Sequence, residues 1–250
     1  REGTLFFTDL GNGTINALRD GALSVFRSSR TDAANGLFFD ESGRLHACEG
    51  GSGRVTRTEL DGRVSVLAES FEGVRFNAPN DLVVARDGSV YRIAPDGAVV
   101  RVVDYLDRPN GIALSPTQST LYVTNDNPAG VGEIHAWDIA ADGMLSNGRI
   151  FATAAVVMDG MVVDENGTLY ATSFALGRNS SGRGVWVFAR DGQTLGLIPT
   201  PEQPTNCTLA DGTLYITASS RVFSIALDVA QADTPVQSTT WPQVKEMGNH

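Results

Sequence analysis

Residues 159–172 read DGMVVDENGTLYAT: a polar residue, an apolar run, a turn around a glycine and a second apolar strand. Only the second half of this phrase occurs near the start of the sequence, in REGTLFFTD (1–9). A phrase repeated at regular intervals predicts a ring or stack of equivalent units. The other copies are NGLFFDESGRLHA (35–47), NDLVVARDGSVY (80–91), NGIALSPTQSTLYVT (110–124) and NCTLADGTLYIT (206–217).

The spacing of the copies predicts the fold. We call the residues that open them the polar heads: Asn35, Asn80, Asn110, Asp159 and Asn206. Three of the intervals between consecutive heads are 45, 49 and 47 residues long, and a propeller blade takes about 40 to 50 residues. A second phrase, as in VWVFARDGQTLGLI (185–198), supplies an outer hairpin. We therefore expect an all-β, six-bladed β-propeller with four-stranded antiparallel blades around a central channel, as a single domain over residues 1–250.

Two places depart from this period. The first copy has no head, so we expect the first blade to be truncated at its N-terminal side. The interval from Asn80 to Asn110 is only 30 residues, which indicates a shortening of about 15 to 20 residues near positions 90–92. Two explanations account for the short interval: a loop is missing from the sequence as given, or the protein has a true deletion. Removing a strand from a closed ring is costly, which favours the missing loop. The tail 231–250 is expected to form an edge or closing strand.

Alternating apolar residues predict strands and no convincing helix. Asp-Gly pairs between the strands, for example Asp20-Gly21 and Asp61-Gly62, are typical of type I′ hairpins. The expected strands are Thr4–Asp9, Arg54–Glu59, Ser65–Ala68, Thr120–Thr124, Glu133–Asp138, Gly184–Phe188, Thr213–Thr217 and Arg221–Leu227.

Composition limits the partners. The net charge is −10, from 29 acidic and 19 basic residues, which disfavours nucleic acid and anionic membranes. No apolar stretch approaches the roughly 20 residues needed to span a bilayer. Cys48 and Cys207 are expected to be buried free thiols. We expect a protein that is not membrane-bound, is a monomer or a weak dimer, and is either cytoplasmic or exported.

The polar heads are the candidate site. In a propeller the innermost strands enter from one face, so equivalent residues converge on one axial point. Asn and Asp supply hard oxygen donors, which suit Ca²⁺ and also Mg²⁺, Mn²⁺ or Zn²⁺. Asp159 is the one carboxylate among the five heads. The alternative is that each head merely favours a bend before a strand.

Four segments carry a resemblance to a known family: RFNAPNDLVVARDG (75–88), DRPNGIALSP (107–116), MDGMVVDENGTLYAT (158–172) and PTPEQPTNCTLADGTLYIT (199–217). They resemble the gluconolactonase and senescence-marker-protein (regucalcin) family of six-bladed propellers, which is more distantly similar to paraoxonases. The resemblance covers nearly the whole chain. It implies a lactonase of the carboxylic ester hydrolase type that depends on one divalent cation, with Ca²⁺ preferred.

The resemblance also implies roles for individual residues. Asn110 and Asp159 match metal ligands, and Asn80 matches a third asparagine that binds the metal or the substrate. Arg75 and Asn77 would lie beside the substrate. A further ligand in the family is a glutamate that opens the first blade; we expect it upstream of Arg1 and interpret Glu2 as a turn residue.

These residues predict the hydrolysis of a sugar lactone, with Asp159 as both metal ligand and general base. Asn206 is expected to contact the substrate. A second possibility is a non-catalytic propeller that binds Ca²⁺ or a protein, and a third is metal-free chemistry, as in strictosidine-synthase-like proteins.

Other polar residues are weaker candidates. His46 and His135 alternate with apolar residues, which favours a structural role. Glu49 follows an inner strand and could reach the channel, but a bulge or turn role is at least as plausible. Trp137 and Trp186 occupy matching positions in two outer strands and are expected to pack between blades.

Overall fold

The computed structural model describes residues 3–28, 33–82, 91–93, 98–106, 108–126, 131–174, 182–227 and 245–246. Every regular element in these residues is a β-strand. The chain divides into two compact units, residues 1–104 with 141–144 and residues 105–140 with 145–250. Among the described residues there is no helix long and apolar enough to cross a membrane.

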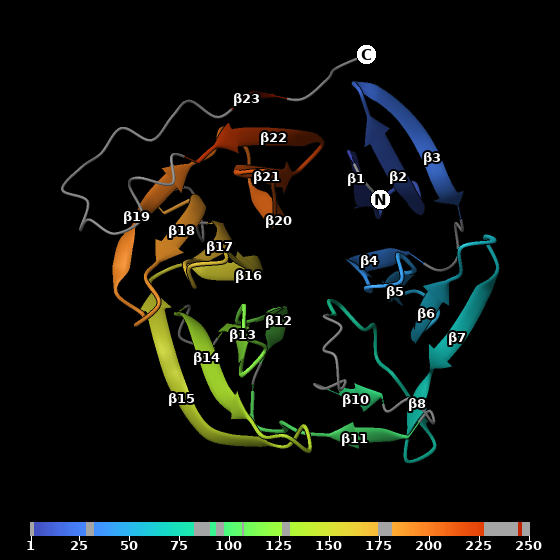
Figure 1. Ribbon diagram of the computed structural model, residues 1–250, viewed down its shortest axis with the longest axis horizontal. Helices are drawn as coiled ribbons and strands as arrows, with labels where there is room; N and C mark the ends of the chain where they lie inside the picture. The colour runs from blue at the N-terminus through green and yellow to red at the C-terminus, as the bar shows by residue number, and fades with distance from the viewer. Residues whose placement is uncertain are drawn as a thin grey trace. The chain divides into compact units, whose positions relative to one another are not determined.

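The first unit contains one three-stranded sheet, one four-stranded sheet and two two-stranded ladders, all antiparallel (Figure 1). The three-stranded sheet is β1 (Thr4–Asp9), β2 (Thr14–Arg19) and β3 (Ala22–Ser28). The four-stranded sheet is β4 (Ala34–Phe39), β5 (Leu45–Glu49), β6 (Arg54–Thr58) and β7 (Val64–Ala68). The ladders are β8 (Ser70–Phe71) with β9 (Val74–Arg75) and β10 (Tyr91–Ile93) with β11 (Val99–Arg101).

The second unit contains three four-stranded antiparallel sheets in chain order. The first is β12 (Pro109–Leu114), β13 (Thr120–Asp126), β14 (Gly132–Ile139) and β15 (Leu145–Ala154). The second is β16 (Val157–Val163), β17 (Leu169–Phe174), β18 (Gly184–Phe188) and β19 (Thr194–Pro199). The third is β20 (Pro204–Ala210), β21 (Thr213–Ala218), β22 (Arg221–Ala226) and β23 (Lys245–Glu246). Within this unit β16 lies beside both β12 and β20, so the first strands of the three sheets are neighbours (Figure 1).

The predicted all-β propeller fold is confirmed, but the predicted number of blades is not met in the described residues. They form five sheets of three or four strands. Two short ladders, β8–β9 and β10–β11, lie between the β4–β7 sheet and β12 in the sequence. Only β10–β11 lies between Asn80 and Asn110, where the spacing of the heads is 30 residues. The shortening was predicted near residues 90–92, where positions 83–90 lie outside the described residues and Tyr91–Ile93 form β10. In the predicted tail, β23 pairs with β22 as the last strand of its sheet.

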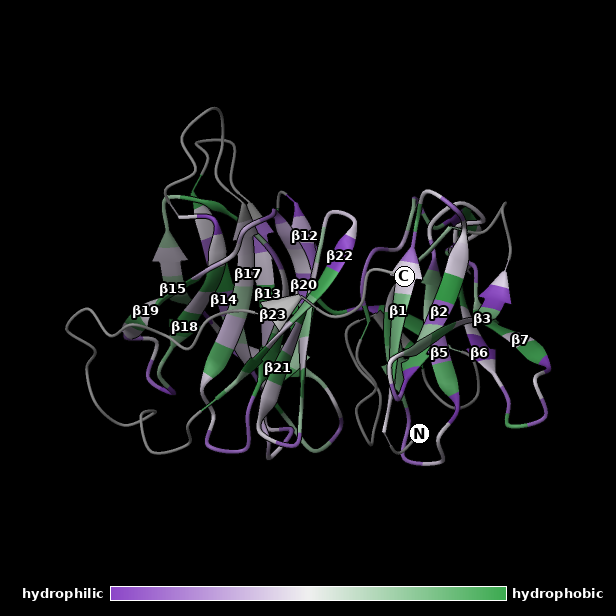
Figure 2. Ribbon diagram, turned by 90° about the horizontal axis from the view of Figure 1, so that it is seen from above, coloured by the Kyte–Doolittle hydropathy of each residue, from purple (hydrophilic) through white to green (hydrophobic). Residues whose placement is uncertain are grey.

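Apolar residues from neighbouring sheets form the core. Ile134, Met158 and Phe188 are fully buried in one cluster that joins the first and second sheets of the second unit. Trp186 packs against this cluster, as predicted for a residue between blades. In the first unit, Ile15 of β2 packs with Leu45 of β5. Figure 2 shows apolar colour along the strands and polar colour at many of the connecting turns.

The Asp-Gly turns are only partly of the predicted type. At Asp20-Gly21 and Asp211-Gly212 both residues have positive φ, as a type I′ turn requires. At Asp61 only the following glycine has positive φ, and the Asp61 carboxylate instead accepts the Arg63 N–H at 2.9 Å. The type I′ prediction is therefore wrong there, because the aspartate side chain stabilises its own turn. The same correction holds for Asp142 and Asp191.

Both predicted free thiols, Cys48 and Cys207, are buried. His135 contacts Glu133 at 2.8 Å and stacks on Trp137. His46 contacts the Asp40 carboxylate at 3.0 Å.

The hydrogen bonds of Asp40 can be tested through the dependence of stability on pH. Burial raises the pKa of Asp40, but hydrogen bonds from His46 and from the Arg44 backbone and side chain outweigh it and lower the pKa from 3.8 to about 2. The stabilisation is therefore present above about pH 4 and is lost as the pH falls towards 2. We expect Asp40→Asn to lower the free energy of unfolding by about 2 kcal/mol at pH 7, with the difference from wild type shrinking between pH 4 and pH 2. Urea unfolding between pH 4 and pH 2 measures the difference in free energy of unfolding. A difference that does not change with pH would contradict a stabilising role for the ionised Asp40 carboxylate.

Candidate functional site

Four of the five polar heads lie on or directly beside irregularities of the first strands, and Asn80 lies outside the strands. A β-bulge leaves residues unpaired and re-aims their side chains. In three sheets the register between the first and second strands shifts around the head, between Ala34 and Leu37, Pro109 and Ile112, and Met158 and Met161. In the last sheet the shift lies just before the head, between Pro204 and Asn206, and Asn206 pairs with Thr217. The repeated phrase thus encodes a displaced polar residue as well as a strand.

The glycine that follows a head is required by a close approach of the next sheet. A Cβ at Gly111 would lie 2.3 Å from the Asp159 carbonyl oxygen, and a Cβ at Gly160 would lie 2.1 Å from Asn206 Oδ1. In the first unit, a Cβ at Gly36 would lie 2.9 Å from the Asn80 carbonyl oxygen. Each of these bulges therefore packs against the next head along the chain.

This packing predicts a large cost for one methyl group. Gly111→Ala must displace the backbone at Asp159, and we expect a loss of about 3 kcal/mol in the free energy of unfolding. Gly11→Ala is the control, because a Cβ there meets only Asp9 Oδ1 at an ordinary 3.5 Å, and its effect should stay within about 0.5 kcal/mol. Chemical denaturation compares the two, and equal effects would show that the close approach is not what matters.

In the second unit a threonine of the second strand bonds to the bulge of each first strand. In the second unit Thr172 Oγ1 donates to the Gly160 carbonyl at 2.8 Å, and Thr217 Oγ1 donates to the Asn206 carbonyl at 3.2 Å. Thr124 lies between two sheets, since its Oγ1 accepts the Gly111 N–H at 2.7 Å and donates to the Asp159 carbonyl at 3.0 Å. The signal for these residues was present in the repeats as LYVT, LYAT and LYIT, but the sequence analysis gave them no role.

The second unit brings together three of the predicted site residues. Asn110, Asp159 and Asn206 are all half-buried on neighbouring first strands. The Asn206 Oδ1 accepts the Cys207 N–H at 2.8 Å, so its position is held by its own backbone. Together they provide one carboxylate and two amides from adjacent strands.

The other three predicted site residues lie in the first unit. Asn80 is exposed, and its Oδ1 accepts a hydrogen bond from Asn35 Nδ2 at 2.7 Å. Arg75 and Asn77 are exposed as well, and Arg75 forms an ion pair with Glu69 at 3.2 Å. A common site for Asn80 with Asn110 and Asp159 stays a prediction.

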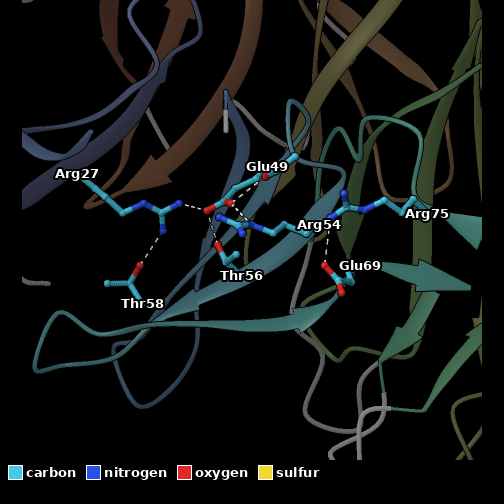
Figure 3. A network of polar contacts seen from close by, with 8 residues as sticks. Arg27, Glu49, Arg54, Thr56, Thr58, Glu69 and Arg75 are labelled. Carbon is cyan, nitrogen blue, oxygen red and sulfur yellow. Dashed lines mark hydrogen bonds and ion pairs between the residues drawn. The ribbon is translucent and has the colours of Figure 1, made fainter. Parts of the chain in front are cut away.

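Glu49 is the polar residue whose role the sequence analysis misjudged. It ends β5, is fully buried, and pairs with Arg27 of β3 and with Arg54 Nε at 2.6 Å (Figure 3). Thr56 Oγ1 donates to the same carboxylate at 2.8 Å. The bulge or turn role is therefore wrong: Glu49 connects the sheet of β1–β3 with the sheet of β4–β7. Its arginine partner in β3 is 22 residues away, which local sequence patterns do not reveal.

The donor set fits a hard cation better than a thiolate or imidazole site. Within the described ranges no cluster of three or more His, Cys, Asp or Glu residues could hold a metal ion. The heads Asn110 and Asp159 instead offer oxygen atoms, which Ca²⁺ and Mg²⁺ prefer. The bulges carry both residues on strands that touch. These residues fit a divalent cation held by oxygen atoms.

Antiparallel sheets in chain order, three of them with a head and a glycine on a bulged first strand, define a β-propeller of repeated blades. Residues 85–220, more than half of the chain, match the family described as SMP-30/Gluconolactonase/LRE-like region. The chain belongs to this family, as its repeated segments predicted.

Individual relatives agree with this assignment. A gluconolactonase of Zymomonas mobilis is 28% identical in an alignment 235 positions long that covers 78% of this chain and 64% of that protein. The chain thus spans less than two thirds of that relative's length. A regucalcin of Danio rerio is 26% identical in an alignment 166 positions long that covers 64% of this chain and 53% of the relative. The solved structure of a gluconolactonase from Xanthomonas campestris has 34% identity and a TM-score of 0.78, and the match covers 90% of this chain and 82% of that one.

Proposed function

We propose that the protein is a lactone hydrolase whose reaction depends on a divalent cation. The observation that carries the proposal is the placement of Asp159 and Asn110 on adjacent, bulged first strands. Two of the relatives, from Zymomonas mobilis and Xanthomonas campestris, are named gluconolactonases. A sugar lactone such as gluconolactone is accordingly the first substrate class to test, with aliphatic lactones second.

Asn110 and Asp159 would hold the cation, with Asn80 as a third oxygen donor. Ca²⁺ is the first candidate, and Zn²⁺, Mn²⁺ and Mg²⁺ suit the same donors less well or with fewer ligands. When bound, such an ion polarises the lactone carbonyl and lowers the pKa of a neighbouring water.

The side chains of this protein supply the other steps. The Asp159 carboxylate accepts a proton from the attacking water as general base. The amides of Asn80 and Asn206, with Arg75 and Asn77, donate hydrogen bonds that orient the hydroxyl groups of the lactone. Transfer of the proton to the ring oxygen completes ring opening and gives the hydroxy acid.

Acid release during hydrolysis provides the test. Purified protein is mixed with gluconolactone or with an aliphatic lactone, and the fall in pH is followed against the spontaneous rate. We expect hydrolysis above that rate, its loss after treatment with a chelator, and its return with Ca²⁺. Hydrolysis that survives removal of the metal would overturn the metal dependence. No turnover with any cation, together with metal binding, would favour the non-catalytic scaffold.

A further inference from the structure

Thr124 links its own glycine to the next head, which its equivalents Thr172 and Thr217 in the second unit do not. Thr172 and Thr217 donate to carbonyl groups of the first strand in their own sheets. In the first unit the equivalent residue is Cys48, whose Sγ donates to the Asp81 carbonyl at 3.4 Å, while the Gly36 N–H donates directly to the Asn80 carbonyl at 2.7 Å. At Thr124 a hydroxyl lies between the glycine and the next head, because it contacts both Gly111 and Asp159.

The hydrogen-bond capacity of a hydroxyl fixes the direction of these contacts. Thr124 Oγ1 has one hydrogen and can accept through its lone pairs. The Gly111 N–H is the donor at 2.7 Å, so the single hydroxyl hydrogen is left for a carbonyl. The Asp159 carbonyl is the nearer acceptor at 3.0 Å, against 3.4 Å for the Gly111 carbonyl. The result is a series of two hydrogen bonds, from the Gly111 N–H to the Thr124 hydroxyl and from that hydroxyl to the Asp159 carbonyl.

The hydrogen bonds through Thr124 are buried, and this burial holds them in place. Thr124 is 0% exposed, and Gly111 beside it is buried. The absence of a side chain at Gly111 lets β16 come close, since a Cβ there would lie 2.3 Å from the Asp159 carbonyl. A buried N–H and a buried carbonyl without partners each carry a desolvation cost. Thr124 therefore fixes the separation of the two strands that present Asn110 and Asp159.

We propose that Thr124 is a positioning residue for the cation site: its hydroxyl sets the spacing between Asn110 and Asp159. The inference rests on the proposed function, because it assumes that these two residues bind the ion together. Groups that hold metal ligands in place typically change metal affinity or activity by about 10- to 100-fold when they are removed.

Three substitutions at Thr124 test the role of the hydroxyl. Thr124→Val keeps the shape and removes both hydrogen bonds, Thr124→Ser keeps the hydroxyl, and Thr124→Cys places the weak thiol donor found at Cys48 in this position. Thr200→Val is the matched control: Thr200 is also a buried threonine of the second unit, and its Oγ1 donates to the Glu202 carbonyl at 2.7 Å.

Calorimetric titration of the whole protein with Ca²⁺ is the readout, with thermal unfolding as a check of the fold. We expect Thr124→Val to weaken Ca²⁺ binding at least about 10-fold, with binding by Thr124→Ser and Thr200→Val within about threefold of wild type and Thr124→Cys between the two extremes. If the valine variant does not fold, a cysteine variant that binds less tightly than the serine variant carries the same conclusion. Equal binding by wild type and all folded Thr124 variants, or an equal loss in Thr200→Val, would overturn the role of Thr124 alone. Absence of divalent-ion binding by the wild type would overturn the metal assignment, and this inference with it.

Discussion

Asp159→Ala is expected to abolish lactone hydrolysis, with a fall in kcat/KM of at least about 10³-fold. General base catalysis alone contributes about 10²- to 10⁴-fold, and the same carboxylate is assigned to the cation. Asp159→Asn separates these functions in part, because it keeps an oxygen donor but cannot take up the proton. We expect the Asn variant to retain weak Ca²⁺ binding and to remain inactive.

Glu165→Gln is the control for Asp159. It removes an exposed carboxylate six positions away in the turn that follows β16. Its rate of hydrolysis should stay within about twofold of wild type, since surface substitutions rarely matter. Chelator-sensitive hydrolysis at a tenth or more of the wild-type rate in Asp159→Ala would show that another group is the base.

Glu49→Gln is expected to cost about 3 kcal/mol in the free energy of unfolding. Removing one member of a buried ion pair leaves its partner charged and poorly solvated. Here two arginines lose their partner, and their side chains are only 15% and 29% exposed at Arg27 and Arg54. The loss acts on the junction between the β1–β3 and β4–β7 sheets, which are the elements that Arg27 and Glu49 connect (Figure 3).

The exposed ion pair of Glu69 with Arg75 provides the comparison in the same unit. These side chains are 55% and 67% exposed, and such pairs contribute about 0 to 1 kcal/mol. Guanidinium unfolding should therefore separate Glu49→Gln clearly from Glu69→Gln. Similar midpoints for the two variants would mean that the charges around Glu49 are relieved by rearrangement.

Much of the fold could be predicted because each copy of the repeated phrase marks where its strands begin and end. Thr4–Asp9 and Gly184–Phe188 form strands with the predicted bounds, and most other predicted strands differ by one or two residues. The count of blades could not be obtained in the same way. It depends on the segment between Asn80 and Asn110, where the period fails.

The candidate site was predictable to the level of its residue types. The repeated phrase identified the heads, and the structure places Asn110, Asp159 and Asn206 on neighbouring strands that are in contact. Thr124 was overlooked because a threonine that ends an apolar strand satisfies ordinary β-propensity. Its importance comes from contacts with Gly111 and Asp159, which are 13 and 35 residues away.

The surroundings of the glycines indicate where the chain tolerates inserted sequence and where it does not. A methyl group at Gly111 or Gly160 would collide with the next first strand, whereas at Gly21 and Gly62 nothing lies within 4 Å of an added Cβ, and only the positive φ of the turn favours glycine there. Gly62 lies in an exposed turn of an outer hairpin, the kind of position where inserted sequence is tolerated. Diversity libraries and peptide tags are therefore best directed to the outer hairpins, while the inner bulges should be left untouched when the substrate range is engineered.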